Sequence, residues 1–319
     1  MVNQTLHSKY EIEKDPIYKT SQQIWIYSAP IILVLGTVTN ILTIAVLLRK
    51  KLRKQTTILY LTVLSVLNLL TLYLGLGKTW LMVAFNVNIY DQSDSLCRLS
   101  TFSLNLLLNL TVWILVAVTV DRCIIVCLPH IAKQICHLKY SKGVVAGLFV
   151  FLSLANMHLF WGVTVQKAHG SSKKECTHGN DFNEFIFPWL SLTLGFIVPF
   201  AIMVIANSFI IRCIYLSHKR LAYHQSNDSK NTNSTKKLSS VTSMLLALNF
   251  TFMVLTLPIM IFLIVEPYHV ANEEITANMY LTWAIVNICD YTEHSLSFIL
   301  YCLAGSTFRR ELRKMLKGK

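Results

Sequence analysis

Charged residues are scarce in this chain. Asp, Glu, Lys and Arg make up 14% of the 319 residues, while 54% are hydrophobic. Soluble domains carry about 25% charged residues. The apolar residues are also gathered into long runs and are not spread as stripes of amphipathic helices. This composition argues against a soluble domain and indicates a membrane protein.

Three other features are missing. Residues 1–23 hold several charges and no apolar core long enough for a signal peptide, so we expect the first apolar run to act as its own insertion signal. No internal repeat is visible, which disfavours a transporter built from duplicated halves. The histidines are scattered, with His158 and His294 isolated, which disfavours a metal hydrolase. We therefore expect no catalytic residues, no metal site and no enzyme activity.

Seven apolar runs are long enough to cross a bilayer, which requires about 20 residues in each helix. A backbone exposed to lipid must satisfy its own hydrogen bonds, so each run is predicted to be helical. The sequence predicts an all-α membrane protein with one domain: a tail over residues 1–23, a seven-helix bundle over 24–303 with a cytoplasmic loop at 217–237, and a final segment at 304–319. The runs are Ile24–Leu48, Thr57–Phe85, Leu96–Leu128, Val144–Val165, Phe187–Leu216, Leu238–Val265 and Thr276–Leu303.

The charges are distributed unequally between the two ends of these runs. The connections after the first, third, fifth and seventh runs, with the run ends beside them, hold 21 of the 29 Lys and Arg residues but 3 of the 16 acids. Basic residues mark the cytoplasmic side, so we expect the N-terminus outside and the C-terminus inside. The net charge of +13 then reflects topology and attraction to anionic lipid, and no nucleic-acid partner is expected.

The predicted outer side contains two further signals. Asn3-Gln-Thr is a glycosylation sequon in the outer tail, whereas the sequons at Asn227 and Asn233 face the cytosol and should stay unmodified. Cys97 and Cys176 are the two of eight cysteines in the outer region, where a disulfide between them is permitted. The other six are interpreted as packing residues.

A charged pair, Asp121-Arg122, lies near the end of the third run. Charges within apolar helices are costly and mark functional sites, although an arginine at the membrane edge can also reach lipid phosphate. Cys97 precedes Arg122 by 25 residues, and other motifs occur at matching intervals. They are Gly36-Thr-Val-Thr-Asn40, Pro199, Phe252 with Pro258, Ser297-Phe-Ile-Leu-Tyr301 and Phe308-Arg-Arg-Glu-Leu312.

With these motifs the chain resembles the rhodopsin-like (class A) G-protein-coupled receptors over about residues 24–317. The resemblance implies a seven-helix bundle with a short amphipathic eighth helix, located in the plasma membrane and coupled to a heterotrimeric G protein. It also implies that Asp121 and Arg122 form the switch at the cytoplasmic end, with Tyr301 supporting the open form. Within the family the chain looks closest to invertebrate FMRFamide-receptor-like neuropeptide receptors, through stretches such as Leu76-Gly-Lys-Thr-Trp80 and Pro129-His-Ile-Ala-Lys-Gln134.

Several positions depart from the family pattern. The aspartate of the second run is replaced by Asn68, and the tryptophan of the sixth run by Thr256. We hypothesise that the buried acid has moved to Glu293, which anchors a cation such as sodium or holds a proton; a purely structural glutamate is the alternative. By family geometry, Glu293 faces a polar cluster in the middle of the membrane with Asn40, Asn68, Thr111 and Ser297.

The resemblance also bears on the ligand. The position of the retinal lysine is Tyr291 and that of the amine-binding aspartate is Leu104, so light and small amines are disfavoured. Acidic and aromatic residues together suit a peptide with a basic and an aromatic side chain. The expected ligand-binding residues are Asp290, Glu266, Lys78, Trp80 and Trp283, although Lys78 could simply neutralise Asp290. The alternatives are a lipid or environmental chemical as ligand, a receptor that couples poorly, and, remotely, a transporter or membrane enzyme.

Overall fold

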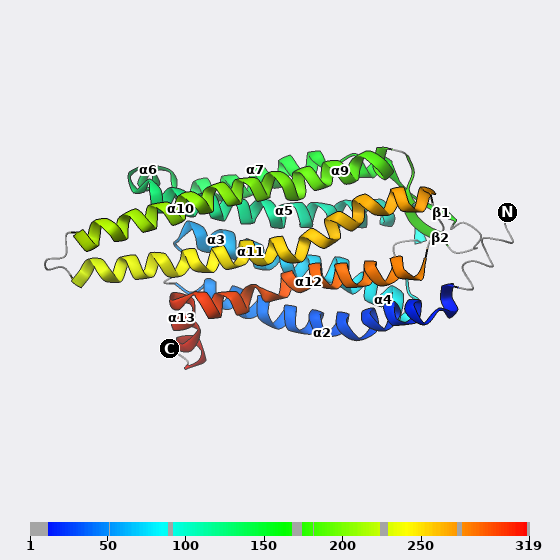
Figure 1. Cartoon of the computed structure of the whole chain (residues 1–319), viewed down its shortest axis with the longest axis horizontal. Helices are drawn as coiled ribbons and strands as arrows, with labels where there is room; N and C mark the ends of the chain where they lie inside the picture. The colour runs from blue at the N-terminus through cyan, green and yellow to red at the C-terminus, as the bar shows by residue number, and fades with distance from the viewer. Residues whose placement is uncertain are drawn as a thin grey trace.

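The computed structural model describes residues 12–50, 52–88, 92–167, 174–180, 182–223, 229–272 and 276–317. Within these residues, seven long helical rods form one elongated bundle (Figure 1). In chain order they are α2 (Pro16–Leu47); α3 (Thr56–Thr71) continued by η1 (Leu72–Gly77) and α4 (Lys78–Phe85); α5 (Asp94–Cys127); α7 (Leu138–Ala155); α9 (Phe187–Leu192) continued by η4 (Thr193–Ile197) and α10 (Val198–Tyr223); α11 (Ser229–Asn272); and α12 (Ala277–Ala304).

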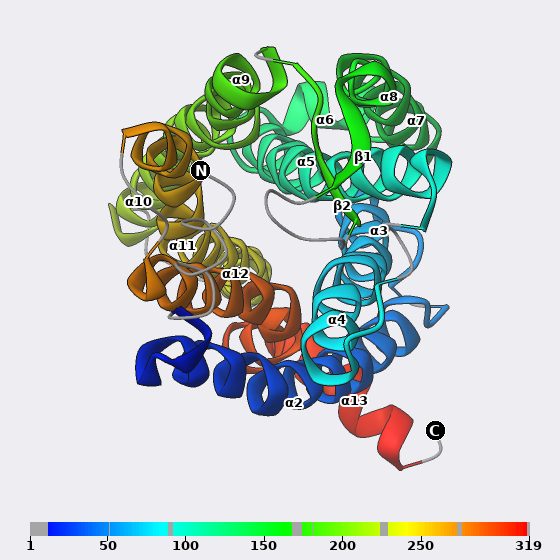
Figure 2. The same cartoon turned by 90° about the vertical axis from the view of Figure 1, so that its right-hand side faces the viewer.

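Short elements cap the two ends of the bundle. The antiparallel strands β1 (Val163–Lys167) and β2 (Lys174–His178) lie at one end, which we call the hairpin end (Figure 1). Figure 2 shows both strands lying across that end of the bundle. Beside them are α8 (Leu159–Gly162) and η3 (Phe182–Ile186), whereas α6 (Pro129–Ile135) and α13 (Ser306–Leu316) belong to the opposite end. We call the latter the Arg122 end.

Several helices extend beyond the apolar runs. α2 begins at Pro16, where the Asp15 carboxylate accepts a hydrogen bond from the Ile17 amide at 2.7 Å and caps the helix. α10 continues to Tyr223 and α11 begins at Ser229, so much of the polar segment 217–237 is helical. Hydropathy marks where a helix leaves the membrane, but the helix itself continues because each added residue gains one backbone hydrogen bond.

The helices have the composition of membrane spans. Among the described residues, six helical segments are long and apolar enough to cross a bilayer: Pro16–Leu47, Thr56–Phe85, Asp94–Cys127, Leu138–Gly162, Phe187–Ser217 and Leu245–Tyr268. α12 has 28 residues but carries Asp290, Glu293 and His294, which lower its mean hydropathy. It is the seventh member of the bundle, and its Asp290 and Glu293 lie in the bundle interior.

Apolar side chains cover the outside of the bundle, while polar ones occupy part of its interior. Val34, Leu154 and Phe250 are each more than 60% exposed, whereas Asn40 and Asn68 are at most 1% exposed. Such an exposed apolar surface is unstable in water and is suited to lipid, where polar groups are best satisfied inside the bundle. The bundle therefore has a lipid-facing exterior and a polar core.

Candidate functional site: a cavity and a polar core

A cavity of about 400 Å³ lies in the hairpin half of the bundle, between α4, α5, α9, α11 and α12. Lys78 and Trp283 line it, as do Phe252 and His294. Aliphatic side chains of α5 and α11 form much of its wall, among them Leu104, Leu108, Val112, Ile259 and Met260. A largely apolar concavity with a few polar groups is typical of a ligand site.

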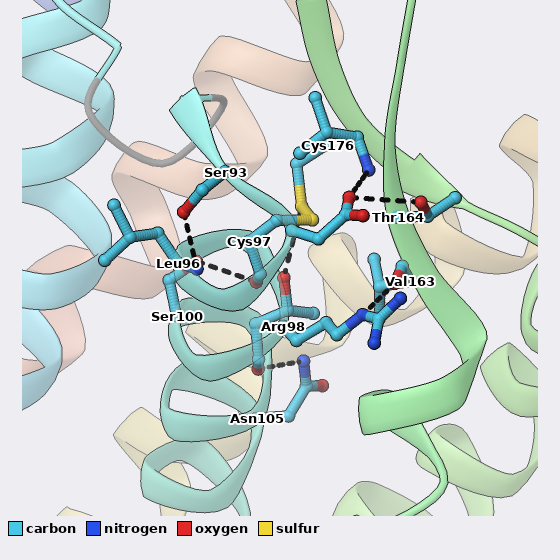
Figure 3. The surroundings of a disulfide bond; sticks show 12 residues. Ser93, Leu96, Cys97, Arg98, Ser100, Asn105, Val163, Thr164 and Cys176 are labelled. Atoms are coloured by element: carbon cyan, nitrogen blue, oxygen red, sulfur yellow. Dashed lines mark hydrogen bonds between the residues drawn. A yellow bond between two sulfur atoms is a disulfide. The ribbon is translucent and has the colours of Figure 1, made fainter.

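The hairpin is fixed beside the cavity by a disulfide. Cys97 of α5 is bonded to Cys176 of β2, with 5.6 Å between their Cα atoms, as the sequence led us to expect (Figure 3). The Arg98 Nε donates to the Val163 carbonyl at 3.1 Å, and the Asp94 carboxylate accepts from the Val165 amide at 2.8 Å. Several links therefore hold the hairpin to the first turns of α5.

Of the three π-helical segments that line the cavity, η1 and η4 lie within long helical rods. η1 contributes Gly75 and η4 contributes Gly195. A Cβ atom at Gly75 would lie 2.5 Å from the Tyr291 hydroxyl oxygen, so only glycine leaves room for this buried tyrosine. π-bulges are frequent at functional sites because they re-aim neighbouring side chains. Neither bulge could be read from the apolar pattern of the sequence.

Asp290 is the acidic group of the cavity. Its carboxylate accepts a hydrogen bond from Thr256 at 2.9 Å, which joins α11 to α12. Two other expected ligand-binding residues, Lys78 and Trp283, also line the cavity. The remaining two, Trp80 and Glu266, are not among the lining residues; Trp80 packs instead in the apolar cluster around Trp25.

A group of amides and hydroxyls that sequence reasoning missed faces the cavity from α5, η3 and α9. Asn105 and Asn109 are one helical turn apart on α5, and Asn183 and Ser191 follow from the other two elements. In the part of the chain that the structure describes, the buried Asn183 Oδ1 and Ser191 Oγ have no hydrogen-bond partner. The spacing of Thr101, Asn105 and Asn109 by four residues was the signal for a polar face.

Between the cavity and the Arg122 end, polar side chains of α2, α3 and α12 form a connected core. Asn68 Nδ2 lies 3.4 Å from the Ser297 hydroxyl, and Asn40 Nδ2 donates to the His294 carbonyl at 2.9 Å. The His294 Nδ1 lies 3.0 Å from Asn68 Oδ1 and 3.3 Å from a Glu293 carboxylate oxygen. The Asn68 Oδ1 is an acceptor, so Nδ1 carries the proton.

This core contains four of the five expected residues and one unexpected one. His294, which looked isolated in the sequence, contacts Asn40, Asn68 and Glu293, and Ser297 joins the core through Asn68. The fifth, Thr111, donates to the Leu107 carbonyl of its own helix and lines the cavity. Across the described ranges, no group of three or more His, Cys, Asp or Glu side chains is arranged to hold a metal ion.

At the Arg122 end, Asp121 is held by α3. Its carboxylate accepts hydrogen bonds from Thr57 at 2.7 Å and Thr56 at 2.9 Å. These two bonds link the start of α3 to α5 through neutral hydroxyl donors. The nearby Cys136 lies between α6 and α7, outside the membrane-spanning segments. Its burial and the charge of Asp121 raise the pKa of its thiol to about 11.

Arg122 and Tyr301 share a second, small cavity of about 40 Å³ at this end, together with Phe308 of α13. Arg122 is 7% exposed and Tyr301 is fully buried. α13 is docked by Phe308 and by the buried Glu311, whose carboxylate lies 3.6 Å from Arg49 and from Lys314. The three expected switch residues thus lie in one region, with Arg122 enclosed.

One expectation about cysteines is wrong. Cys127 of α5 and Cys213 of α10 were interpreted as packing residues, yet they form a second disulfide, with Cα atoms 5.6 Å apart. Their separation of 86 residues gave no sign that the two helices bring them together. Cys123, Cys136, Cys289 and Cys302 are free.

The model of the 7 transmembrane receptor (rhodopsin family) matches residues 39–299, most of the chain. The chain belongs to this family. Similar proteins include the Danio rerio G-protein coupled estrogen receptor 1, 24% identical over 89% of this chain and 77% of its own length. The Mus musculus thyrotropin-releasing hormone receptor is 23% identical over 100% and 86%, and the Homo sapiens cysteinyl leukotriene receptor 1 is 25% identical over 98% and 89%.

As a rhodopsin-family receptor, the protein is a multi-pass plasma-membrane protein that responds to an extracellular ligand by signalling through a G protein, and it is not an enzyme. The relatives named here are hormone and leukotriene receptors and not invertebrate FMRFamide-type receptors. Their names span different ligand classes, so the ligand has to be argued from the cavity of this receptor.

Proposed function

We propose that this receptor binds an extracellular peptide, whose basic side chain pairs with Asp290. The observation that carries the proposal is the position of Asp290 in the cavity, where its carboxylate accepts a hydrogen bond from a neutral hydroxyl, that of Thr256. A carboxylate in a largely apolar cavity gains from a charged hydrogen-bond donor on the ligand, because such bonds are about twice as strong as neutral ones.

The rest of the cavity supports a peptide. Trp283 supplies an aromatic face near the acid, suited to a guanidinium or an aromatic ring. On the opposite side, Asn105, Asn109, Asn183 and Ser191 offer partners for backbone amides or a terminal carboxamide. A peptide ending in Arg-Phe-amide combines a basic group, an aromatic ring and a terminal carboxamide, which match these three features of the cavity.

In the proposed orientation the hairpin end is extracellular. Of the chain's 29 Lys and Arg residues, 21 belong to the opposite side of the predicted topology. The Cys97–Cys176 disulfide at the hairpin end fits the oxidising exterior. The Arg122 end then faces the cytosol, where Asp121, Arg122 and Tyr301 form the G-protein switch.

A ligand would act on this switch through Thr256. When a ligand's basic group pairs with Asp290, it competes with the Thr256 hydroxyl and weakens the link between α11 and α12. Pro258 lies two residues beyond Thr256, at a point where α11 lacks a backbone hydrogen-bond donor (Figure 1 shows the bend of this helix). Ligand binding thereby favours the state in which α11 has moved.

A second candidate is a lipid or environmental ligand with an aliphatic body. Leu104, Leu108, Ile259 and Met260 favour it, because they would bury a hydrocarbon chain in the same cavity. Such a ligand would not depend on Asp290, so the two candidates predict different results for a variant at that position.

The decisive experiment measures G-protein activation by surface-expressed receptor against a panel of amidated peptides. We expect Asp290→Asn to weaken the response to the active peptide by about 10- to 100-fold in concentration, the effect of losing one charged hydrogen bond. Glu266→Gln is the matched control, an acid on α11 that does not line the cavity, and should change little. Arg122→Ala should abolish the signal without changing peptide binding. An unchanged response to the active peptide in Asp290→Asn would exclude this pairing, whereas a surface-expressed receptor that answers to no peptide would favour the aliphatic ligand.

A further inference from the structure

The Cys127–Cys213 disulfide joins α5 and α10 at the end of the bundle that carries Arg122. Cys127 is the last residue of α5 and lies five residues beyond Arg122, so both are within about one and a half turns of one helix. The Cα separation of 5.6 Å lies within the range that a disulfide spans without backbone movement.

The surroundings of Cys127 suit the reduced form as well as the oxidised form. Its sulfur lies 3.4 Å from the Phe209 carbonyl oxygen, one helical turn before Cys213 on α10, so a free thiol would keep a hydrogen-bond acceptor. Both cysteines are only partly buried. This contrasts with the hairpin disulfide, in which Cys97 is 0% exposed.

We propose that Cys127 and Cys213 form a redox-controlled bridge that limits the separation of α5 and α10 on the G-protein side. The inference rests on the proposed orientation for its cytosolic setting, where glutathione keeps accessible thiols reduced. The bridge then forms only when an oxidant such as hydrogen peroxide is present, and glutathione reverses it.

The chemistry balances with these reagents. One thiolate attacks the O–O bond of hydrogen peroxide and becomes a sulfenic acid, releasing water once the leaving hydroxide takes up a proton. The second thiolate attacks that sulfur, the S–S bond forms, and a second water leaves. In reduction, two glutathione thiols return two electrons and two protons and become glutathione disulfide.

The effect of the bridge follows from the position of Arg122. Arg122 is 7% exposed, so a partner protein can reach it only when the surrounding helix ends separate. A covalent link between α5 and α10 removes one direction in which they can do so. The oxidised receptor is therefore held nearer the closed arrangement seen in this structure.

The test uses the purified full-length receptor in lipid nanodiscs, treated with hydrogen peroxide or reduced glutathione. Differential alkylation and mass spectrometry report the linked peptide, and hydrogen–deuterium exchange reports opening at residues 124–128 and 209–216. We expect peroxide to form the link and to slow exchange there by about tenfold or more, and glutathione to reverse both while the Cys97–Cys176 link persists.

Two variants make the result specific. Cys127→Ser should lose the link and the slowing of exchange, whereas Cys123→Ser, a free cysteine one turn earlier on α5, should retain both. If the link does not form, or forms without slowing exchange, the proposal is wrong. Neither result depends on a ligand, and an inverted orientation would be detected separately by the glycosylation of Asn3.

Discussion

Two acidic side chains lie three residues apart on α12, and their surroundings differ. Asp290 lines the cavity and accepts from Thr256, whereas Glu293 is 6% exposed and lies beside the protonated nitrogen of His294. His294 in turn reaches Asn68, the residue that replaces the aspartate of other family members. The neighbour of the Glu293 carboxyl group is therefore a histidine N–H donor. A bound cation would instead require several oxygen ligands at this position.

Because a carboxylate buried in the bundle is costly to keep charged, we expect Glu293 to hold a proton and not a sodium ion. In that case added sodium changes ligand-free G-protein activation equally in the wild type and in Glu293→Gln, because neither side chain binds the ion. Glutamine still accepts from His294, so the variant keeps the polar core intact. Nucleotide exchange measured in sodium and in N-methylglucamine buffers distinguishes the two cases. Asn68→Asp is the control, since it returns an acid to α3. A sodium response present in the wild type and lost in Glu293→Gln would instead show a bound cation.

Some functional residues could be predicted from the sequence and their hydrogen-bond partners could not, for a physical reason. Asp121, Arg122 and Asn40 belong to recognisable motifs, and Asn68 could be placed as the residue that replaces the family's aspartate, so their regions could be predicted from the sequence. The partners of Asp121 and Glu293 could not, because Thr56, Thr57 and His294 look like ordinary polar residues in the sequence. Their importance arises only from which helix faces which.

At the scale of elements, the contact between α3 and α5 depends on Asp121. This carboxylate is 7% exposed and accepts from two threonines at the start of α3. We expect the double substitution of Thr56 and Thr57 by valine to lower the free energy of unfolding by about 1.5–3 kcal/mol or more, since a buried charge loses its donors.

Thermal unfolding of the purified variants, followed by reaction of newly exposed cysteines with a fluorogenic maleimide, measures this loss. Thr62→Val is the matched control, because Thr62 is also on α3 but donates to the Ile58 carbonyl of its own helix. Equal unfolding temperatures for the double variant and the control would show that Asp121 finds other partners.

The elements themselves were predictable to different degrees. The long helices follow from apolar runs that exceed the thickness of a bilayer. The hairpin of β1 and β2 could not be predicted in this way. The run Val144–Val165 was expected to be helical throughout, but α7 ends at Ala155 and β1 begins at Val163, while β2 lies in a connection of mixed polarity. The π-helical segments were also missed, since a single extra residue in a turn leaves the apolar composition unchanged.

For the whole molecule, the orientation in the membrane is the property on which the proposed function depends. Asn3 lies outside the described residues, but its sequon belongs to the end of the chain expected outside the cell. We expect the expressed receptor to show one glycosidase-sensitive gel shift, lost in Asn3→Gln and retained in Asn233→Gln. Modification at Asn227 or Asn233 would place the α10–α11 connection outside and reverse the orientation.

The hairpin across the end of the bundle also affects the rates at which a ligand enters and leaves the cavity. Because β2 is covalently tied to α5 and Asp94 holds β1, this cover cannot swing away as a free loop would. In the proposed orientation a ligand passes the edge of the hairpin both when entering and when leaving, so this barrier slows the two rates together and leaves the equilibrium affinity unchanged. A receptor built in this way should have a long residence time and a slow washout, and its signal should outlast the pulse of ligand that started it.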